Sequence, residues 1–265
     1  MKPTLSSLEA ARWLKTRRAL AAPRARLLCL PYAGGGAVVY HHWSAALPQD
    51  VEVRAAQLPG RQERLQEPAQ VSLLTVVQNL AAALRALPPA PLVIYGHSYG
   101  SILAFELARA LRGTALAPRA LVVAARGGPQ TAGRAEPVHR LSEPAFKDAL
   151  HVLYGIPRHI LAEEDLMELA LPSLRGDFEA VETYQYVPSE PLDVPITVLW
   201  GTEDRLVTET GIRAWQELSA LPVRFHSTKA GHLFVDTHRA WVLQHVAAAL
   251  HESAGESRTS STPTP

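Results

Sequence analysis

Six short runs rich in apolar residues recur along the chain, with helical patterns between most of them. Most of the runs are continuous rather than alternating, which is typical of strands buried on both faces of a parallel sheet. They occupy residues 27–30, 51–57, 92–95, 120–125, 196–200 and 223–226. The helical patterns cover residues 71–87, 102–111, 210–218 and 241–250. Strand followed by helix, repeated, predicts an α/β domain with a mostly parallel, doubly wound sheet.

One stretch, about residues 139–186, breaks this alternation because it has helical patterns and no good strand. Helices are predicted at 141–150 and 163–171, with a break at residues 155–157 and an end at Pro172. An all-helical insertion between two core strands is expected to form a lid over a pocket. Extra helices that serve stability alone are the alternative.

The two ends of the chain are expected to lie outside the core domain, which we place at residues 25–251. Residues 1–24 predict a short helix and a connector at the periphery. Residues 252–265 are rich in Ser, Thr and Pro without an apolar anchor, so a disordered tail is expected there.

The composition suits one large globular domain and excludes several classes of partner. Of the 265 residues 47% are hydrophobic and 19% charged, so a sizeable core can form. The net charge of +1 argues against nucleic acid or an anionic membrane as an obligatory partner. The single cysteine, Cys29, lies in an apolar run, which predicts strand packing in a reducing compartment. With no secretory signal or membrane-length run visible, we expect a cytoplasmic protein.

The motif with the clearest chemical meaning is GHSYG at residues 96–100, which fits Gly-x-Ser-x-Gly. The pentapeptide alone is a weak signal, but here it follows the strand at 92–95 and opens the helix at 102–111. This context predicts the nucleophile elbow of the α/β-hydrolase fold. Ser98 would then stand at a helix N-terminus, where the dipole favours a developing negative charge. A surface Gly-Ser loop is the alternative.

A serine hydroxyl needs a base to take its proton, and the base needs a carboxylate to orient it. In this fold the acid and then the histidine follow the serine along the chain. Asp204 comes after the strand at 196–200, and His232 comes after the strand at 223–226. We therefore predict that Ser98, His232 and Asp204 form a catalytic triad at one edge of the sheet.

Four other residues are weaker candidates for these roles. Glu203 adjoins Asp204 but should point elsewhere, and Asp236 follows the histidine and is expected to cap a helix. His97 is expected to pack beneath the elbow, and His226 lies within the last strand as a structural histidine. Some members of this fold place the acid one strand earlier, but the loop after residue 125, RGGPQ, has no carboxylate, which strengthens the assignment of Asp204.

The oxyanion that forms during acyl transfer needs two backbone N–H donors. We predict one at Tyr99, directly after the serine, and the other at Ala33 in the glycine-rich loop at residues 31–36. That loop lacks the motifs of a dinucleotide or phosphate site. The pair at residues 41–42, HH, has no further ligand at metal-binding spacing. No metal or organic cofactor is expected.

Taken together, several segments resemble the type II thioesterases that accompany polyketide synthases and non-ribosomal peptide synthetases. The resemblance covers about residues 26–250. The matching segments are CLPYAGG at 29–35, LPGR at 58–61, GHSYG at 96–100 with AFELA at 104–108, LPSLRGDF at 171–178 with ETY at 182–184, and GHLF at 231–234. Several motifs in this order are far more specific than the elbow alone.

This chain departs from the family pattern at three positions without losing a catalytic group. Tyr99 stands where Met is commoner, Gly36 where Ser is commoner, and Arg205 where Pro often follows the acid. The change at Tyr99 is expected to alter the pocket beside the nucleophile and hence the acyl preference.

The resemblance implies the same triad and the same oxyanion donors, and it implies a substrate. That substrate is an acyl group held as a thioester on the phosphopantetheine arm of an acyl or peptidyl carrier protein. The implied task is editing, in which stalled or aberrant units are hydrolysed through an acyl-serine. Because carrier proteins are usually acidic, Arg61, Arg64 and Arg126 are candidates for docking one, with ordinary solvated arginines as the alternative.

Three other functions stay open at this point. A related enzyme of the same pathway would release or cyclise the finished product, or transfer the acyl group to another acceptor. A general carboxylesterase or lipase would have the same elbow. A catalytically inactive module would bind the carrier protein without turnover. We expect a monomer in each case.

Overall fold

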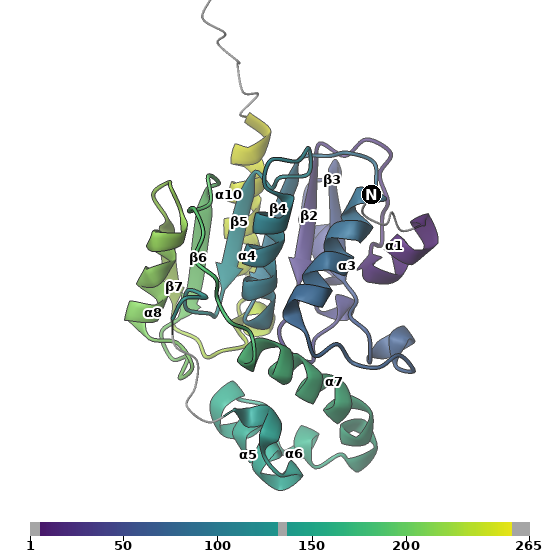
Figure 1. The fold of residues 1–265 in the computed structure, drawn as a ribbon, viewed down its shortest axis with the longest axis vertical. Helices are drawn as coiled ribbons and strands as arrows, with labels where there is room; N and C mark the ends of the chain where they lie inside the picture. Colours follow the sequence, from purple (N-terminus) through teal and green to yellow (C-terminus); the bar gives the residue numbers. More distant parts are fainter. Residues whose placement is uncertain (1–5, 132–136, 256–265) are drawn as a thin grey trace, which may run out of the picture.

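The sheet of this protein has seven strands in the order β1-β3-β2-β4-β5-β6-β7 (Figure 1). The computed structural model describes residues 6–131 and 137–255. The strands are β1 (Leu14–Lys15), β2 (Ala25–Leu30), β3 (Val51–Ala56), β4 (Leu92–His97), β5 (Ala120–Ala124), β6 (Ile196–Gly201) and β7 (Arg224–Thr228). Neighbouring strands pair in parallel, apart from β1, which runs antiparallel to β3. The predicted mostly parallel sheet is confirmed.

Helices cover both faces of this sheet. They are α1 (Ser7–Trp13), α2 (Trp43–Ala46), α3 (Leu73–Arg85), α4 (Tyr99–Leu111), α5 (Glu143–Tyr154), α6 (Arg158–Leu161), α7 (Glu164–Glu182), α8 (Glu209–Arg213), α9 (Phe234–Thr237) and α10 (Arg239–Gly255). Figure 1 shows α3 and α4 on one face and α10 on the other. None of the described helices is long and apolar enough to cross a membrane.

The continuous apolar runs of the sequence follow from this double coverage. In β2, Leu28 and Leu30 pack into the core beneath α3 and α4, whereas Leu27 and Cys29 pack into the core beneath α10. Successive side chains of a strand point to opposite faces, so a strand covered on both faces is apolar at every position. Cys29 is fully buried in this strand, as predicted.

The N-terminal segment is more deeply integrated than the peripheral position we expected for residues 1–24. The expected helix, α1, is present, but Ala10, Trp13 and Leu14 are buried in the core of the domain. Leu14 then begins β1, which adds an antiparallel edge strand to β3. With a helix of seven residues and a strand of two, the segment is too short for its periodicity to show.

The helices α5, α6 and α7 occupy the chain between β5 and β6, where the helical insertion was expected. Figure 1 shows them together beyond one end of the sheet. The predicted end of a helix at Pro172 is wrong, because α7 runs through this proline to Glu182. A proline inside a helix removes one backbone hydrogen bond. Buried side chains on both sides of it, among them Met167 and Phe178, hold the two halves in line.

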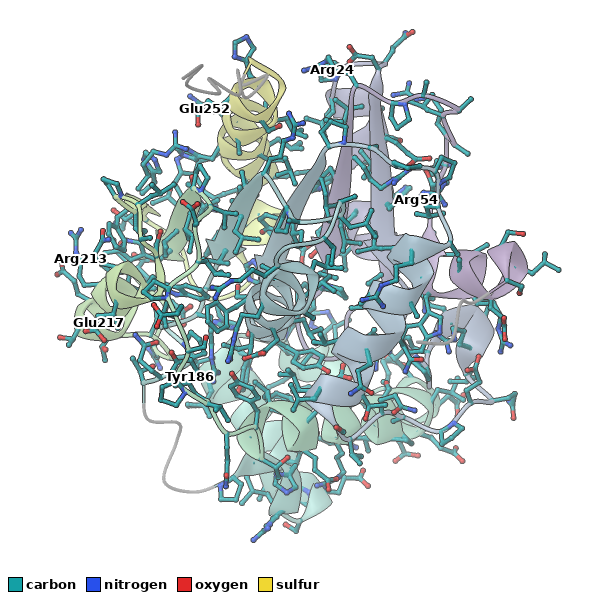
Figure 2. The ribbon with its side chains drawn as sticks, turned by 45° about the horizontal axis from the view of Figure 1, so that its top comes forward. Arg24, Arg54, Tyr186, Arg213, Glu217 and Glu252 are labelled. Atoms are coloured by element: carbon teal, nitrogen blue, oxygen red, sulfur yellow. The ribbon has the colours of Figure 1, made fainter. Side chains whose placement is uncertain are left out.

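The C-terminal helix continues past the predicted boundary at residue 251. Glu252 lies on the last turns of α10, at the end of the molecule away from α5–α7 (Figure 2), and its carboxylate pairs with Arg224 of β7. The prediction of a disordered tail from residue 252 is therefore wrong for residues 252–255, which are helical, and its residues 256–265 lie outside the described residues.

The buried position of Trp13 makes the N-terminal helix a stability element. We expect Trp13→Ala to lower the free energy of unfolding by about 3 kcal/mol, because a large buried ring is lost. Leu8→Ala on the same helix is the control, since Leu8 is 81% exposed, and it should cost less than about 0.5 kcal/mol. Urea unfolding measures both variants, and equal small losses would show that the segment is peripheral after all.

Candidate active site

Ser98 stands on a strained turn between β4 and α4. Its backbone has φ 54° and ψ −111°, which is rarely populated by residues with side chains. Two glycines make the turn possible: a Cβ on Gly96 would lie 2.1 Å from the oxygen of Gly100, and one on Gly100 would lie 2.1 Å from the oxygen of Leu30. The spacing of the motif is therefore a packing requirement.

Hydrogen bonds from the neighbouring strand hold this turn in place. The Ser98 N–H donates to the carbonyl of Ala124, at the end of β5, over 2.8 Å. The hydroxyl of Ser101, in the first turn of α4, accepts from the N–H of Ala124 and lies within donating distance of two carbonyl oxygens, 2.9 Å from Gly96 and 2.8 Å from Ala124. The elbow is thus anchored to the sheet on two sides, which fixes the direction of the serine side chain.

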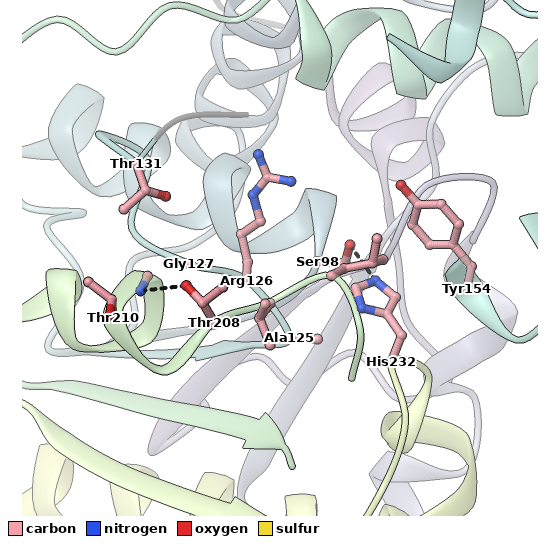
Figure 3. Close-up of a pocket in the computed structure, with 12 residues that line it drawn as sticks. Ser98, Ala125, Arg126, Gly127, Thr131, Tyr154, Thr208, Thr210 and His232 are labelled. Atoms are coloured by element: carbon pink, nitrogen blue, oxygen red, sulfur yellow. Dashed lines mark hydrogen bonds between the residues drawn. The ribbon is translucent and has the colours of Figure 1, made fainter. Parts of the chain in front are cut away.

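The structure brings the three predicted residues of the triad into one hydrogen-bonded line. The Ser98 Oγ lies 2.8 Å from Nε2 of His232, and Nδ1 of the same imidazole lies 2.7 Å from Oδ2 of Asp204. All three residues are buried, each less than 10% exposed. Figure 3 shows the contact between Ser98 and His232 at the edge of a cavity. This geometry allows a proton to pass from the hydroxyl to the imidazole.

The acid and the histidine meet because the ends of β6 and β7 approach each other closely. A Cβ on Gly201, the last residue of β6, would lie 2.2 Å from the oxygen of Ala230. Two hydrogen bonds hold the loop that follows β6: the N–H of Glu203 donates to Ala230 O, and the N–H of Leu206 donates to Oδ1 of Asp204. One carboxylate oxygen is thereby left for His232.

The rival residues lie elsewhere or have other partners. The side chain of Glu203 is 56% exposed, and its nearest cation is Lys229 at 3.9 Å. His226 stacks on His245 of α10, with ring centroids 4.2 Å apart. Asp236 accepts a hydrogen bond from the hydroxyl of Tyr32, and it lies inside the short helix α9, so the prediction that it caps a helix is wrong.

His97 packs beneath the elbow, as expected, and also supports the turn that carries His232. Its Nε2 lies 2.8 Å from the backbone oxygen of His232 and donates to it, while Nδ1 lies 3.2 Å from the hydroxyl of Tyr95. Complete burial, and then the neighbouring imidazole of His232, lower the pKa of His97 to about 3. His97 is therefore neutral at ordinary pH and places no positive charge beside His232.

The two predicted oxyanion donors flank Ser98 from different elements. Tyr99 is the first residue of α4, and Ala33 lies in the loop after β2. No described residue accepts a hydrogen bond from the backbone N–H of either. The next N–H in the loop, that of Gly34, is already taken because it donates to Oδ2 of Asp177 over 2.7 Å. Ala33 and Tyr99 thus offer free donors beside the serine.

A buried ion pair that sequence analysis did not predict fixes this loop. Arg61 forms two hydrogen bonds with Asp177 of α7, at 2.6 and 2.8 Å, and donates a third to the oxygen of Gly35. Arg61 is 5% and Asp177 1% exposed. Burial opposes the charge of Arg61, but Asp177 outweighs it and raises the pKa of Arg61. The signal was present, since both residues lie in segments that carry the family resemblance.

The structure corrects the hypothesis that Arg61 and Arg64 dock a carrier protein. The guanidinium of Arg61 is buried in its ion pair with Asp177. Arg64 is 5% exposed, pairs with Glu67 and lies over the ring of Trp13. Neither guanidinium is available to a partner protein. Basic residues in a sequence are normally solvated, and nothing in the local pattern distinguishes a buried one.

Two cavities adjoin Ser98 and His232. The larger, of 410 Å³, runs from Ser98 towards α8 (Figure 3), and the smaller, of 30 Å³, lies beneath α5 and α7. Tyr154, at the end of α5, borders both, with its ring 5.3 Å from that of His232. Within the described ranges, no group of three or more His, Cys, Asp or Glu side chains could hold a metal ion.

The ion pair between Arg61 and Asp177 leads to a prediction for stability and turnover. We expect Asp177→Asn to lower the unfolding free energy by about 3 kcal/mol, because the buried Arg61 loses its counter-charge. The loop that carries Ala33 also loses its anchor at Gly34, so turnover should fall as well. Glu168→Gln, an exposed change on the same helix, is the control for both measurements. A stable, fully active Asp177→Asn variant would contradict this role.

The low pKa of His97 predicts a pH dependence of stability. Between about pH 6.5 and pH 3 the unfolded chain protonates this imidazole and the folded protein does not. Stability from His97 is therefore complete above pH 6.5 and is lost as the pH falls, by up to about 1.4 kcal/mol per pH unit. His97→Gln keeps a side-chain donor but does not titrate. Urea unfolding from pH 7 to pH 4 should give a shallower pH slope for His97→Gln, and equal slopes would contradict the assignment.

Comparison with known proteins agrees with this geometry. A sequence family described as "Thioesterase domain" matches residues 25–252. The "Probable cadicidin biosynthesis thioesterase" of Streptomyces griseus is 38% identical over 242 residues, which cover 91% of this chain and 67% of that protein. "Gramicidin S biosynthesis protein GrsT" of Aneurinibacillus migulanus is 36% identical over 207 residues, which cover 78% and 81%.

A solved structure with a closely similar fold is that of "the type II thioesterase BorB from the borrelidin biosynthetic cluster". It superposes with a TM-score of 0.84 at 36% identity, covering 94% of this chain and all of that one. The predicted α/β-hydrolase fold is confirmed. Because the family match spans most of the sequence and the fold agrees, the chain belongs to the thioesterase family.

Proposed function

We propose that this protein is a type II thioesterase of polyketide or non-ribosomal peptide biosynthesis, acting on acyl groups carried by acyl or peptidyl carrier proteins. The observation that carries the proposal is the unbroken hydrogen-bonded line from Ser98 through His232 to Asp204 at the edge of a cavity. Relatives named for cadicidin and gramicidin S biosynthesis, and a type II thioesterase of the borrelidin biosynthetic cluster with a similar fold, support this proposal. Editing of stalled or aberrant acyl units is the task that we propose for it, as the resemblance to type II thioesterases implies.

In the first half of the proposed reaction, Ser98 becomes acylated. Its Oγ attacks the thioester carbonyl carbon while Nε2 of His232 takes the hydroxyl proton, and Asp204 stabilises the imidazolium through Nδ1. The backbone N–H groups of Ala33 and Tyr99 accommodate the negative charge on the carbonyl oxygen. The tetrahedral species collapses by breaking the C–S bond. Because thiols are fairly acidic, with pKa values near 8.5, the sulfur leaves readily. The proton held by Nε2 of His232 passes to this sulfur, which gives the free thiol and returns the imidazole to its neutral form.

In the second half, water replaces the thiol. His232 takes a proton from a water molecule, the resulting hydroxide attacks the acyl carbon, and the same two N–H groups stabilise the new oxyanion. His232 then returns the proton to Oγ of Ser98 as the ester bond breaks. The products are the free acid and the unloaded phosphopantetheine thiol. Nothing in these steps calls for a metal or an organic cofactor.

The lone, buried Cys29 suits the reducing cytoplasm, where we propose that the enzyme acts. A buried thiol is not required by the mechanism. Burial raises the pKa of this thiol well above its usual range, so it stays protonated and unreactive in the folded protein.

The proposed mechanism requires the hydroxyl of Ser98. We expect Ser98→Ala to lower kcat on acyl-carrier-protein thioesters by about 10⁴-fold or more, because removal of the nucleophile disables the whole triad. Release of the free thiol and the free acid measures the reaction. Ser189→Ala, on an exposed loop, is the matched control and should turn over at the parent rate.

Product analysis in the same assay separates the related functions. Free acid as the product supports hydrolysis, whereas a cyclised or transferred acyl product would indicate release or acyl transfer. Faster turnover of simple oxygen esters than of carrier-protein thioesters would indicate a general esterase. Equal rates for the parent and Ser98→Ala would overturn the mechanism, and no turnover by either would leave only a binding role.

A further inference from the structure

The 410 Å³ cavity beside Ser98 has one permanently charged group among its described lining residues, the guanidinium of Arg126. Arg126 follows the end of β5, and Figure 3 shows its side chain between Thr131 on one side and Ser98 on the other. Arg126, the third arginine that we considered for docking a carrier protein, thus lines the cavity beside the nucleophile. Thr208 and Thr210, from the start of α8, also line this cavity.

The backbone around Arg126 is firmly held. Ala125, the residue before it, has φ 54°, and its N–H donates to Leu199 of β6 over 3.0 Å. The carbonyl oxygen of Arg126 accepts a hydrogen bond from the indole of the buried Trp215 over 2.8 Å. Its side chain therefore leaves the loop from a fixed point, which a residue that recognises a substrate requires.

The guanidinium itself has no hydrogen bond or ion pair with any residue in the described ranges. Glu182 lies near enough for its charge to act on Arg126, but its oxygens bind His139 and the backbone N–H of Val138. Burial lowers the pKa of Arg126, and Tyr154 and Glu182 offset this only in part. An arginine stays charged regardless, so the cavity contains a partly desolvated cation that needs an acceptor.

The other cavity at Ser98 leaves little room for an acyl chain. Its 30 Å³ hold about two water molecules, and apolar side chains such as Leu150, Leu174 and Phe178 surround it. An acyl group of more than a few carbons attached to Ser98 therefore extends into the cavity that contains Arg126. There it displaces the water that would otherwise solvate the guanidinium.

The free-energy cost of displacing that water depends on whether the acyl group has hydrogen-bond acceptors for the N–H groups of Arg126. A plain alkyl chain leaves the N–H groups of Arg126 without acceptors, and an unsatisfied charged donor is costly. A chain with an oxygen acceptor restores the hydrogen bonds. We propose that Arg126 is a specificity-determining residue, selecting acyl groups that bear a carbonyl or carboxylate oxygen over alkyl acyl groups of the same length. This inference rests on the proposed thioesterase function and specifies its substrate class.

The test compares three six-carbon acyl groups on the same carrier protein: hexanoyl, 3-oxohexanoyl and adipoyl. The first has no acceptor beyond the thioester, the second has a neutral carbonyl oxygen and the third has a terminal carboxylate. The measured quantity is kcat/KM for each oxygenated group relative to hexanoyl. We expect Arg126→Gln to lower at least one of these two ratios about tenfold relative to the parent, and the substrate affected shows whether the acceptor is neutral or anionic. Comparing variant with parent cancels the intrinsic reactivity of each thioester.

Two further variants guard the interpretation. Arg213 lies on the outer side of the neighbouring helix α8 (Figure 2), and its side chain is 57% exposed. Arg213→Gln should therefore leave both ratios at the parent value. Arg126→Lys keeps the charge without the forked donors, and it should retain part of the preference for adipoyl if the carboxylate is the acceptor. It also provides a second reading if Arg126→Gln folds poorly.

The outcomes separate this inference from the function on which it rests. Ratios that are unchanged in both Arg126 variants, or equal losses for all three acyl groups, overturn the selection of oxygenated chains. Hydrolysis that still depends on Ser98 would leave the thioesterase function intact in that case. Absence of Ser98-dependent hydrolysis of every acyl group would instead overturn the function itself.

Discussion

The buried pair between Arg61 and Asp177 is the interaction on which the rest of the site depends. Asp177 belongs to α7, in the helical insertion, whereas Arg61 follows β3 in the body of the domain. Together they hold the backbone of Gly34 and Gly35, because Asp177 accepts from the N–H of Gly34 and Arg61 donates to the oxygen of Gly35. One ion pair thus joins the insertion, the sheet and the loop beside Ser98. A burial this complete is tolerated because each charge satisfies the other and the loop takes up the remaining donors and acceptor sites.

Around Ser98, the backbone of α4 lies in direct contact with the backbone at the ends of two strands. The elbow needs glycines because α4 begins directly against the ends of β2 and β4. Strain of this kind persists only where surrounding contacts fix it, and here the hydroxyl of Ser101 and the carbonyl of Ala124 do so. His97 supports the opposite side by holding the backbone of His232. The reacting side chains are therefore positioned largely by contacts with the main chain.

Much of the fold could be predicted from the sequence, because the dominant signal was strong. Continuous apolar runs required strands covered on both faces, and all six predicted strands occur, at slightly different bounds. The N-terminal segment could not be predicted in the same way, since its contribution rests on Trp13 and Leu14 rather than on a repeating pattern. Pro172 was misjudged because the local rule against proline in helices ignores tertiary contacts, which hold α7 together on both sides.

The candidate site could also be predicted only in part from the sequence. Ser98, Asp204 and His232 were found because each follows a predicted strand, and parallel strands bring their carboxyl ends to one edge. The pairing of Arg61 with Asp177 was not predicted. Both residues lie in segments that carry the family resemblance, but they are 116 positions apart and nothing local in the sequence shows that they pair. The interior position of Arg126 was hidden for the same reason. A single sequence indicates which residues carry charge, and only the packed structure shows which charges have been satisfied.

The contact between Gly201 and Ala230 has a consequence for how such a site can change over time. The ends of β6 and β7 touch there with no space for even one methyl group, and the carboxylate and the imidazole lie just beyond. Any side chain at position 201 would push the end of β6 away from Ala230 and so move Asp204 away from His232. The short distance between Asp204 and His232 therefore depends on the absence of a side chain at Gly201. A substitution of this glycine is therefore expected to impair the site without changing any residue of the triad.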